Sequence, residues 1–204
     1  MKFVRVFALI AFAVALCAAP AAAQTSGPPA KKQVQKKQQK KKLDRAQQLD
    51  GLFAALKAAP NANIAKAIAA RIDAALLVTE SDTLNLLMVR ARTTIEAKEF
   101  PVALELLDAA IGINPRYTEA WAQRATVYFV QKDYYRALAD LRVVLAQEPR
   151  HYQALAGLGI ILQDLGEDKR ALEAFRRALE INPHIENVPD LVKRLRLKVE
   201  GREI

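Results

Sequence analysis

The chain has 204 residues, of which 52% are hydrophobic, and its formal net charge is +9. Residues 1–43 contain nine lysines and arginines and no acidic residue, so residues 44–204 are neutral overall. The net charge therefore gives no reason to expect a nucleic-acid-binding surface on residues 44–204, the part of the chain that can form a hydrophobic core. The single cysteine, Cys17, excludes a disulfide within one chain, and the only histidines, His151 and His184, are too few for a metal-ligand cluster.

The first 23 residues have the pattern of a secretory signal peptide. A basic start leads into the apolar run Val6–Ala19, and Ala21–Ala23 supply the small residues of a cleavage site. The apolar run is shorter than the roughly 20 residues that a membrane-spanning helix needs. We expect cleavage after Ala23 and a bacterial periplasmic or secreted protein. A retained N-terminal anchor and a lipoprotein modified at Cys17 are the alternatives.

Residues 24–43 form a low-complexity segment rich in lysine and glutamine. The segment has almost no apolar residue to bury and its lysines repel one another, so it is predicted to be a disordered linker. The run Lys31–Lys42 is either a solvated spacer or an electrostatic tether to an anionic envelope surface. No aromatic residue lies among these lysines, so a stacking surface for nucleic-acid bases is not predicted.

Residues 44–83 are predicted to form a helix pair. The first helix runs from Asp44 to Ala59 and ends at Pro60, and the second runs from Ile64 to Thr79 behind an asparagine cap. Both carry an apolar stripe at helical spacing.

Three copies of one pattern follow, in residues 84–117, 118–151 and 152–185, at a spacing of 34 residues. Each copy carries an alanine in its second helix and a proline near its end: Ala103, Ala137, Ala171, Pro115, Pro149 and Pro183. The predicted helices are 83–97, 101–113, 117–131, 134–147, 152–165 and 168–181. In residues 186–204, a last helix from Val188 to about Glu200 has one apolar and one basic face, as a capping helix does.

The third copy has leucines at 155, 158 and 162, Gly159, Phe175 and Ala178, together with its alanine and proline. This pattern resembles the tetratricopeptide repeat (TPR) signature. The resemblance implies an all-α fold, an α-solenoid of helix-turn-helix repeats. Residues 44–83 would then be a degenerate N-terminal repeat, followed by three clear repeats and the capping helix. Single helix pairs cannot bury their apolar sides, so the repeats must stack.

Two arginines depart from this pattern. Arg90 and Arg124 occupy the place of Leu158, and Thr94 occupies the place of Leu162. Either the arginines substitute for a core residue through a shared polar contact, or they belong to a stripe that faces a ligand.

The TPR resemblance implies a binding groove on the concave face, lined by the first helix of each pair. The groove residues would be Asn85, Met88, Arg92, Ala122, Thr126, Phe129, Ala156, Ile160 and Gln163. TPR proteins that bind chaperone C-termini carry Lys, Arg and Asn at such places, whereas this groove has small and apolar residues. We therefore expect it to bind an apolar helix or extended segment of a partner protein, or an element of this same chain.

The sequence favours a protein–protein interaction module over an enzyme. No Ser/His/Asp or Cys/His set can be assembled, so no catalytic residue and no cofactor is predicted. The two histidines fall on turns after the repeat-ending prolines, where a solvated side chain is expected. The alternative function is a cell-envelope assembly or scaffold subunit tethered by its basic tail.

Overall fold

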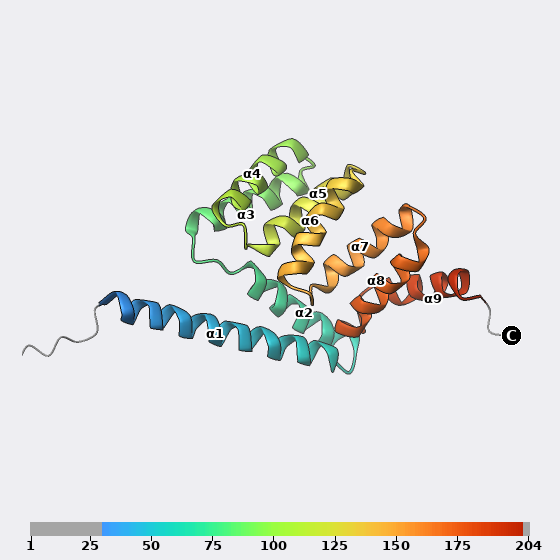
Figure 1. The fold of residues 1–204 in the computed structure, drawn as a ribbon, viewed down its shortest axis with the longest axis horizontal. Coiled ribbons are helices and arrows are strands. Elements are labelled where there is room, and N and C mark those ends of the chain that lie inside the picture. Colours follow the sequence, from blue (N-terminus) through green and yellow to red (C-terminus); the bar gives the residue numbers. More distant parts are fainter. Residues whose placement is uncertain (1–29, 202–204) are drawn as a thin grey trace, which may run out of the picture. The chain divides into compact units, whose positions relative to one another are not determined.

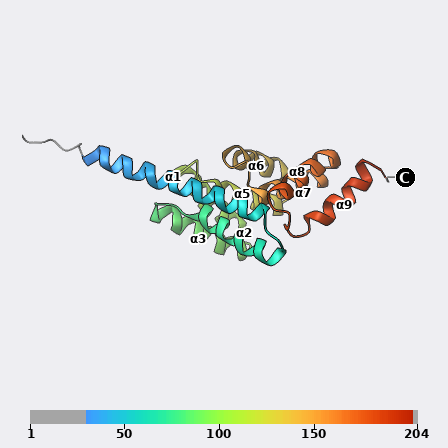
Figure 2. The same ribbon diagram turned by 90° about the horizontal axis from the view of Figure 1, so that it is seen from below.

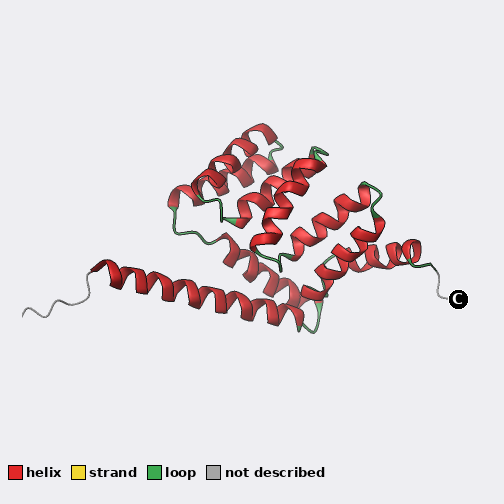
Figure 3. Cartoon of the chain, in the orientation of Figure 1, coloured by secondary structure: helices red, strands yellow, loops and turns green. Residues whose placement is uncertain are grey.

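The computed structural model describes residues 30–201, with side chains from residue 44 onward, and every regular element in this range is an α-helix (Figures 1 and 3). The chain divides into two units, Met1–Lys41 and Lys42–Ile204, and the second unit holds the repeats. The helices are α1 (Ala30–Lys57), α2 (Ala62–Leu77), α3 (Asp82–Glu96), α4 (Phe100–Ile113), α5 (Thr118–Val130), α6 (Tyr134–Gln147), α7 (Tyr152–Asp164), α8 (Asp168–Ile181) and α9 (Val188–Val199).

The start of α1 differs from the sequence-based expectation. The helix begins at Ala30 rather than Asp44, so the backbone of residues 30–43 is helical where a disordered linker was predicted. Lysine, glutamine and alanine are all good helix formers, and they extend a helix whose end is already fixed by packing. The predicted signal peptide, its cleavage site and residues 24–29 lie outside the described residues.

Three antiparallel helix pairs, α3–α4, α5–α6 and α7–α8, form the predicted repeats and stack on one another. The six predicted helices agree with the structure to within a residue or two at each end. The repeated alanines Ala103, Ala137 and Ala171 have no exposed surface, because the helices of each pair approach closely there. Gly159 serves the same purpose in α7, since a Cβ atom on it would lie 2.5 Å from the buried ring of Phe175.

The turn inside each repeat places one residue in the left-handed region. Lys98 and Lys132 have φ of 60°, and Gly166 has φ of 77°. These three residues recur at the repeat spacing, just past the ends of α3, α5 and α7. Glycine suits this place in the third repeat because it has no Cβ atom, and the lysines show that the other repeats adopt the same turn without it.

Helix α9 caps the C-terminal end of the array. Its Val188 and Leu195 are buried in one cluster with residues of α7 and α8. Outside the cluster, Arg176 of α8 pairs with Glu200 at 2.7 Å, and Lys198 pairs with Asp168. The predicted amphipathic cap is confirmed.

The helix pair expected in residues 44–83 is present as α1 and α2, but it does not stack on α3 as a further repeat. We call residues 44–77 the N-terminal hairpin; Figure 2 shows α2 running alongside the last turns of α1. The hairpin packs on α5 and on the third repeat, α7–α8, and it does not precede α3 in the stack. Its buried residues Leu52, Phe53, Leu56 and Ile72 belong to the same core cluster as α7, α8 and α9. The extended connection after Leu77 allows α2 to leave the repeat path.

Among residues 30–201, none of the helices combines the length and the apolar character that crossing a membrane requires.

Candidate functional site

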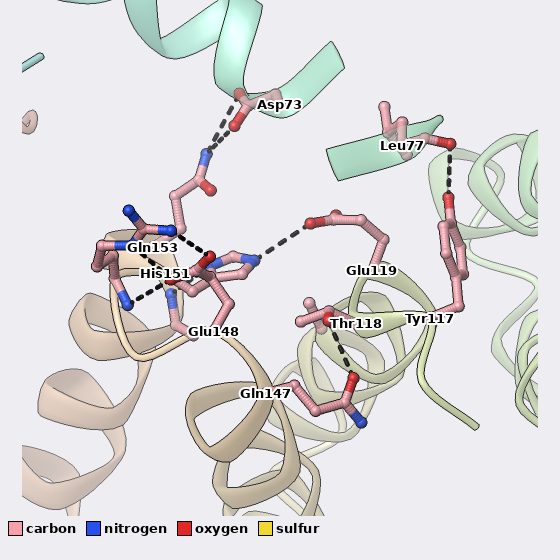
Figure 4. A network of polar contacts seen from close by, with 12 residues as sticks. Asp73, Leu77, Tyr117, Thr118, Glu119, Gln147, Glu148, His151 and Gln153 are labelled. Carbon is pink, nitrogen blue, oxygen red and sulfur yellow. Dashed lines mark hydrogen bonds and ion pairs between the residues drawn. The ribbon is translucent and has the colours of Figure 1, made fainter. Parts of the chain in front are cut away.

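The turns that end successive repeats bind the N-terminal hairpin. After the first repeat, the Tyr117 hydroxyl donates to the backbone oxygen of Leu77 at 3.0 Å, as Figure 4 shows. After the third, His184 Nε2 lies 2.9 Å from the backbone oxygen of Ala59. The hairpin therefore lies along the edge of the array where the repeat-ending prolines are.

The middle turn holds the hairpin through Arg150. Its guanidinium donates to Asp50 of α1 at 2.7 Å and to Glu148 at 2.8 Å. It also lies 4.5 Å from the centre of the Phe53 ring. The hydrogen bonds to Glu148 and then to Asp50 raise the pKa of Arg150. A charged, stacked guanidinium thus joins α1 to the second repeat boundary.

His151 is buried in this edge, with 5% of its surface exposed, so the expectation of a solvated turn histidine is wrong for it. Its Nδ1 accepts from the backbone N–H of Ala154 at 3.2 Å and so caps α7. Its Nε2 lies 3.2 Å from Oε1 of Glu119 in α5 (Figure 4). A neutral ring with its proton on Nε2 satisfies both contacts, because it accepts from Ala154 and donates to Glu119.

Further polar groups lie along the hairpin contact beside His151 and Glu119. Gln153 donates to Asp73 of α2 at 3.2 Å (Figure 4). Burial, together with the charge of Glu119, raises the pKa of Asp73, although the Gln153 hydrogen bond opposes the rise. Burial and Glu119 also raise the pKa of Tyr117 to about 12. These groups hold a neutral tyrosine and a partly desolvated acid at the hairpin contact.

A cavity of about 110 Å³ opens in the seam between α5 and α7, next to this edge. Its lining comes mainly from these two helices: Ala122, Ala125, Thr126, Phe129, Leu141, His151, Gln153, Ala154, Gly157 and Ile161. The walls are mostly small or apolar, and His151, Gln153 and Thr126 supply the polar atoms.

The structure brings together three of the nine predicted groove residues, Ala122, Thr126 and Phe129, which line the cavity. Asn85 and Arg92 lie exposed on α3, and Gln163 is half-buried on α7 outside the cavity lining.

Two of the predicted groove residues are not accessible. Met88 is 4% exposed and lies in the core of the first repeat, and Ala156 is 8% exposed. Ala156 belongs to the cluster that contains the hairpin residues, and Ile160 packs against that cluster. The α7 end of the predicted groove thus shares a core cluster with an element of this same chain, the N-terminal hairpin.

The comparisons with known proteins agree with this architecture. Residues 152–185 match the model of the tetratricopeptide repeat. A TPR repeat-containing protein of Rhizobium etli is 37% identical over 155 residues, which are 76% of this chain and 76% of the relative. The chain belongs to the tetratricopeptide repeat family.

Solved TPR structures share the fold. The first TPR of Spaghetti (RPAP3), bound to an HSP90 peptide, has a TM-score of 0.56 at 16% identity, covering 60% of this chain and 97% of that one. The type III secretion chaperone SycD of Yersinia enterocolitica, in complex with a peptide of the translocator YopD, has a TM-score of 0.54 at 16% identity. That match covers 58% of this chain and 96% of SycD.

Arg124 has a structural role within the TPR array. Its guanidinium donates to both carboxylate oxygens of Asp140, at 2.8 and 2.7 Å, and to Asp108 of the preceding repeat at 2.5 Å. Its charged group also lies 4.7 Å from the centre of the Trp121 ring. A polar contact, one of the alternatives from the sequence, therefore holds for Arg124, but Arg90 does not share it. Arg90, at the equivalent place, is exposed.

Sequence reasoning missed the α7 side of the cavity, namely His151, Gln153, Ala154, Gly157 and Ile161. The TPR pattern places the groove of α7 at Ala156 and Ile160, but the hairpin cluster takes up that face. One signal was present: Gly157 is a glycine inside a helix with nothing within 4 Å of its Cβ position, so close packing does not require it. No group of His, Cys, Asp and Glu suited to a metal ion occurs among the described residues.

Proposed function

We propose that this TPR protein is a protein–protein interaction module that binds a segment of a partner through the cavity between α5 and α7. The cavity itself carries the proposal. Its 110 Å³ is several times the roughly 10–15 Å³ that a single water molecule needs, so it has room for part of a side chain. Mostly apolar walls with a few polar atoms are typical of sites that bind an apolar anchor.

The lining favours an apolar residue of a helix or extended strand. Ala122 and Gly157 leave space, and Phe129 and Ile161 supply apolar contact. Thr126 and Gln153 can bond backbone groups of the bound segment. The peptides in the Spaghetti and SycD structures support a role of this kind. Binding rather than catalysis suits this lining, since His151 is already engaged on both ring nitrogens.

The test fills the cavity without disturbing the fold. In Gly157→Leu the new side chain starts in open space, so the helix should tolerate it while the cavity is lost. Gly112→Leu is the matched control, since Gly112 also has nothing within 4 Å and lies on α4 away from the cavity. Peptides would be selected from a random display library against the full-length protein, and their affinities measured by calorimetry.

We expect selected peptides with an apolar anchor to lose more than about tenfold in affinity for Gly157→Leu, equivalent to about 1.4 kcal/mol. Gly112→Leu should bind as the wild type does. Equal affinities for all three proteins would rule out the cavity as the anchor site.

We also propose that the protein is exported, to the periplasm or beyond, after removal of residues 1–23. The support is the order of basic, apolar and small residues in this segment. The intact mass of the protein from fractionated cells tests it. A mature form beginning at Gln24 is expected, and an unprocessed chain in the cytoplasm would contradict export.

The second candidate is an envelope scaffold tethered by the basic run Lys31–Lys42. Helical backbone begins at Ala30, so these lysines are carried on a helix rather than on a random coil. Binding of the mature chain to anionic vesicles should then fall steeply as salt rises, because surface attraction is screened. Lack of binding at low salt would reduce this segment to a spacer.

A further inference from the structure

The outer side of the first repeat exposes apolar side chains. Leu86 and Val89 of α3 are 57% and 64% exposed, and Val102 of α4 is 45% exposed. We call the surface formed by Leu86, Val89, Arg90 and Leu106 the open face. Val102 lies beside it, because the equivalent residues Arg136 and Arg170 stay exposed in the repeats that have a preceding pair. The N-terminal hairpin packs on α5 and the third repeat, so within residues 44–201 it does not stack on the open face.

The open face occupies the place of a contact between repeats. The positions equivalent to Leu86 in the next two repeats are Ala120 and Ala154, which are 0% and 4% exposed. Two turns further along the same helices, Val127 and Ile161 are 0% and 1% exposed. These residues are buried because a preceding helix pair packs on them. The first repeat presents the same side without that pair, whereas the end of a solenoid normally carries a polar cap.

A second copy cannot cover this face by continuing the stack from its other end. Helix α9 already packs on α8, the helix that would have to meet the open face. The outer side of α9 is exposed and basic, with Lys193, Arg194 and Arg196. Arg90 would meet charges of its own sign there, which is unfavourable. Of the two ends of a second copy, only its own open face can then meet this surface.

The charges on the first repeat suit that arrangement. Arg124 has Asp140 as its partner in its own repeat, but the place of Asp140 is taken by Leu106 in the first repeat. Arg90 is exposed and has no ion pair among the described residues, and Glu105 is exposed on α4. A two-fold axis between α3 and α4 lays α3 of each copy across α4 of the other. That arrangement brings Arg90 toward Glu105 of the second copy, twice in one contact.

We propose that the open face is the contact between two copies of this chain in a two-fold symmetric dimer. Apolar Leu86, Val89 and Leu106 form the centre, and Arg90 and Glu105 fix the register. The contact uses the same patch on both copies, so it closes at two and does not propagate into a filament.

Sedimentation equilibrium of the full-length protein tests the dimer. The wild type should sediment as a dimer, and Val89→Glu should raise the dissociation constant by more than about tenfold, since the added charge acts twice. Val130→Glu is the matched control, because Val130 is 53% exposed at the end of α5, and it should stay dimeric.

Charge reversal tests the register. Arg90→Glu alone should weaken the dimer, and Arg90→Glu combined with Glu105→Arg should restore it.

Several results would overturn the proposal. They are a monomeric wild type at about 100 μM, a dimer that Val89→Glu leaves intact, or a dimer that is lost only in Leu197→Glu of α9, which would place the contact at the other end. A monomer in which the open face binds residues 1–29 or a different protein would also overturn it.

Discussion

At the residue scale, one turn position recurs in all three repeats and is filled in two ways. Lys132 has φ of 60°, and its N–H donates to Phe129 while the next N–H donates to Tyr128, at 2.9 Å each. Gly166 holds the same turn at φ of 77°. A side chain with a Cβ atom pays about 1–2 kcal/mol in this region, whereas glycine does not. The backbone at the two lysines is therefore locally strained, and the packing of the repeats offsets this strain.

Replacing Lys132 with glycine should raise the free energy of unfolding by about 0.5–1 kcal/mol, because the relieved strain exceeds glycine's larger loss of chain entropy. Gly166→Lys should lower it by a similar amount. Urea denaturation measures both. Equal stabilities for the two variants would mean that the turn geometry is not set by this residue.

The pair Arg124–Asp140 has an apolar counterpart in the third repeat, where Leu158 and Ala174 occupy the same places. Arg124→Leu alone should cost about 3–5 kcal/mol, because Asp140 is 3% exposed and would lose its partner. The double variant Arg124→Leu, Asp140→Ala imports the arrangement of the third repeat and should recover most of that loss. A double-mutant cycle in urea measures the coupling, and additive losses would contradict it.

At the element scale, the repeats and the two helices of the hairpin could be predicted from sequence, but the docking of the hairpin could not. Ala103, Ala137 and Ala171 recur because each repeat makes the same contacts with its neighbours, so their spacing encodes the stack. The contacts of the hairpin, such as that between Ala59 and His184, join residues far apart in the chain without any periodic signal. The α7 wall of the cavity could not be predicted either, because it depends on where the hairpin packs.

The docking of α2 should depend on pH through Asp73. Burial raises the pKa of Asp73 above its ordinary value of 3.8, so the folded state binds the proton more tightly than the unfolded chain does. Ionised Asp73 therefore lowers stability above its folded pKa, and this loss is relieved as the pH falls toward 3.8. Asp73→Asn should raise the thermal midpoint at pH 7 and remove this part of the pH dependence. Thermal unfolding from pH 7 to pH 4 checks it.

The exposed Asp44→Asn is the control for that experiment, and it should follow the wild-type curve. If Asp73→Asn follows that curve too, burial of the carboxyl does not limit the docking of α2.

At the scale of the whole molecule, the hairpin makes the stability of the array uneven. Its buried residues join the core of α7, α8 and α9, whereas α3–α4 form a separate cluster with residues of α5. A linear array is held by contacts between neighbours, and a pair at an open end is the first to unfold locally.

Amide hydrogen exchange should therefore be slowest in α7 and α8 and fastest in α3 and α4. The measurement is best made on Val89→Glu, in which the open face stays uncovered. Uniform exchange along the array would show that the hairpin does not bias local unfolding.

The contact between His184 and Ala59 also has a consequence for biosynthesis, because it joins residues 125 positions apart. The hairpin leaves the ribosome first, but its core partners in α7, α8 and α9 are among the last residues made. At about 5–20 residues per second, the hairpin waits roughly 6–25 s with Leu52, Phe53 and Leu56 unburied. The nascent chain thus presents an apolar helix pair to chaperones for most of its synthesis, and high contact order makes its docking a late folding step.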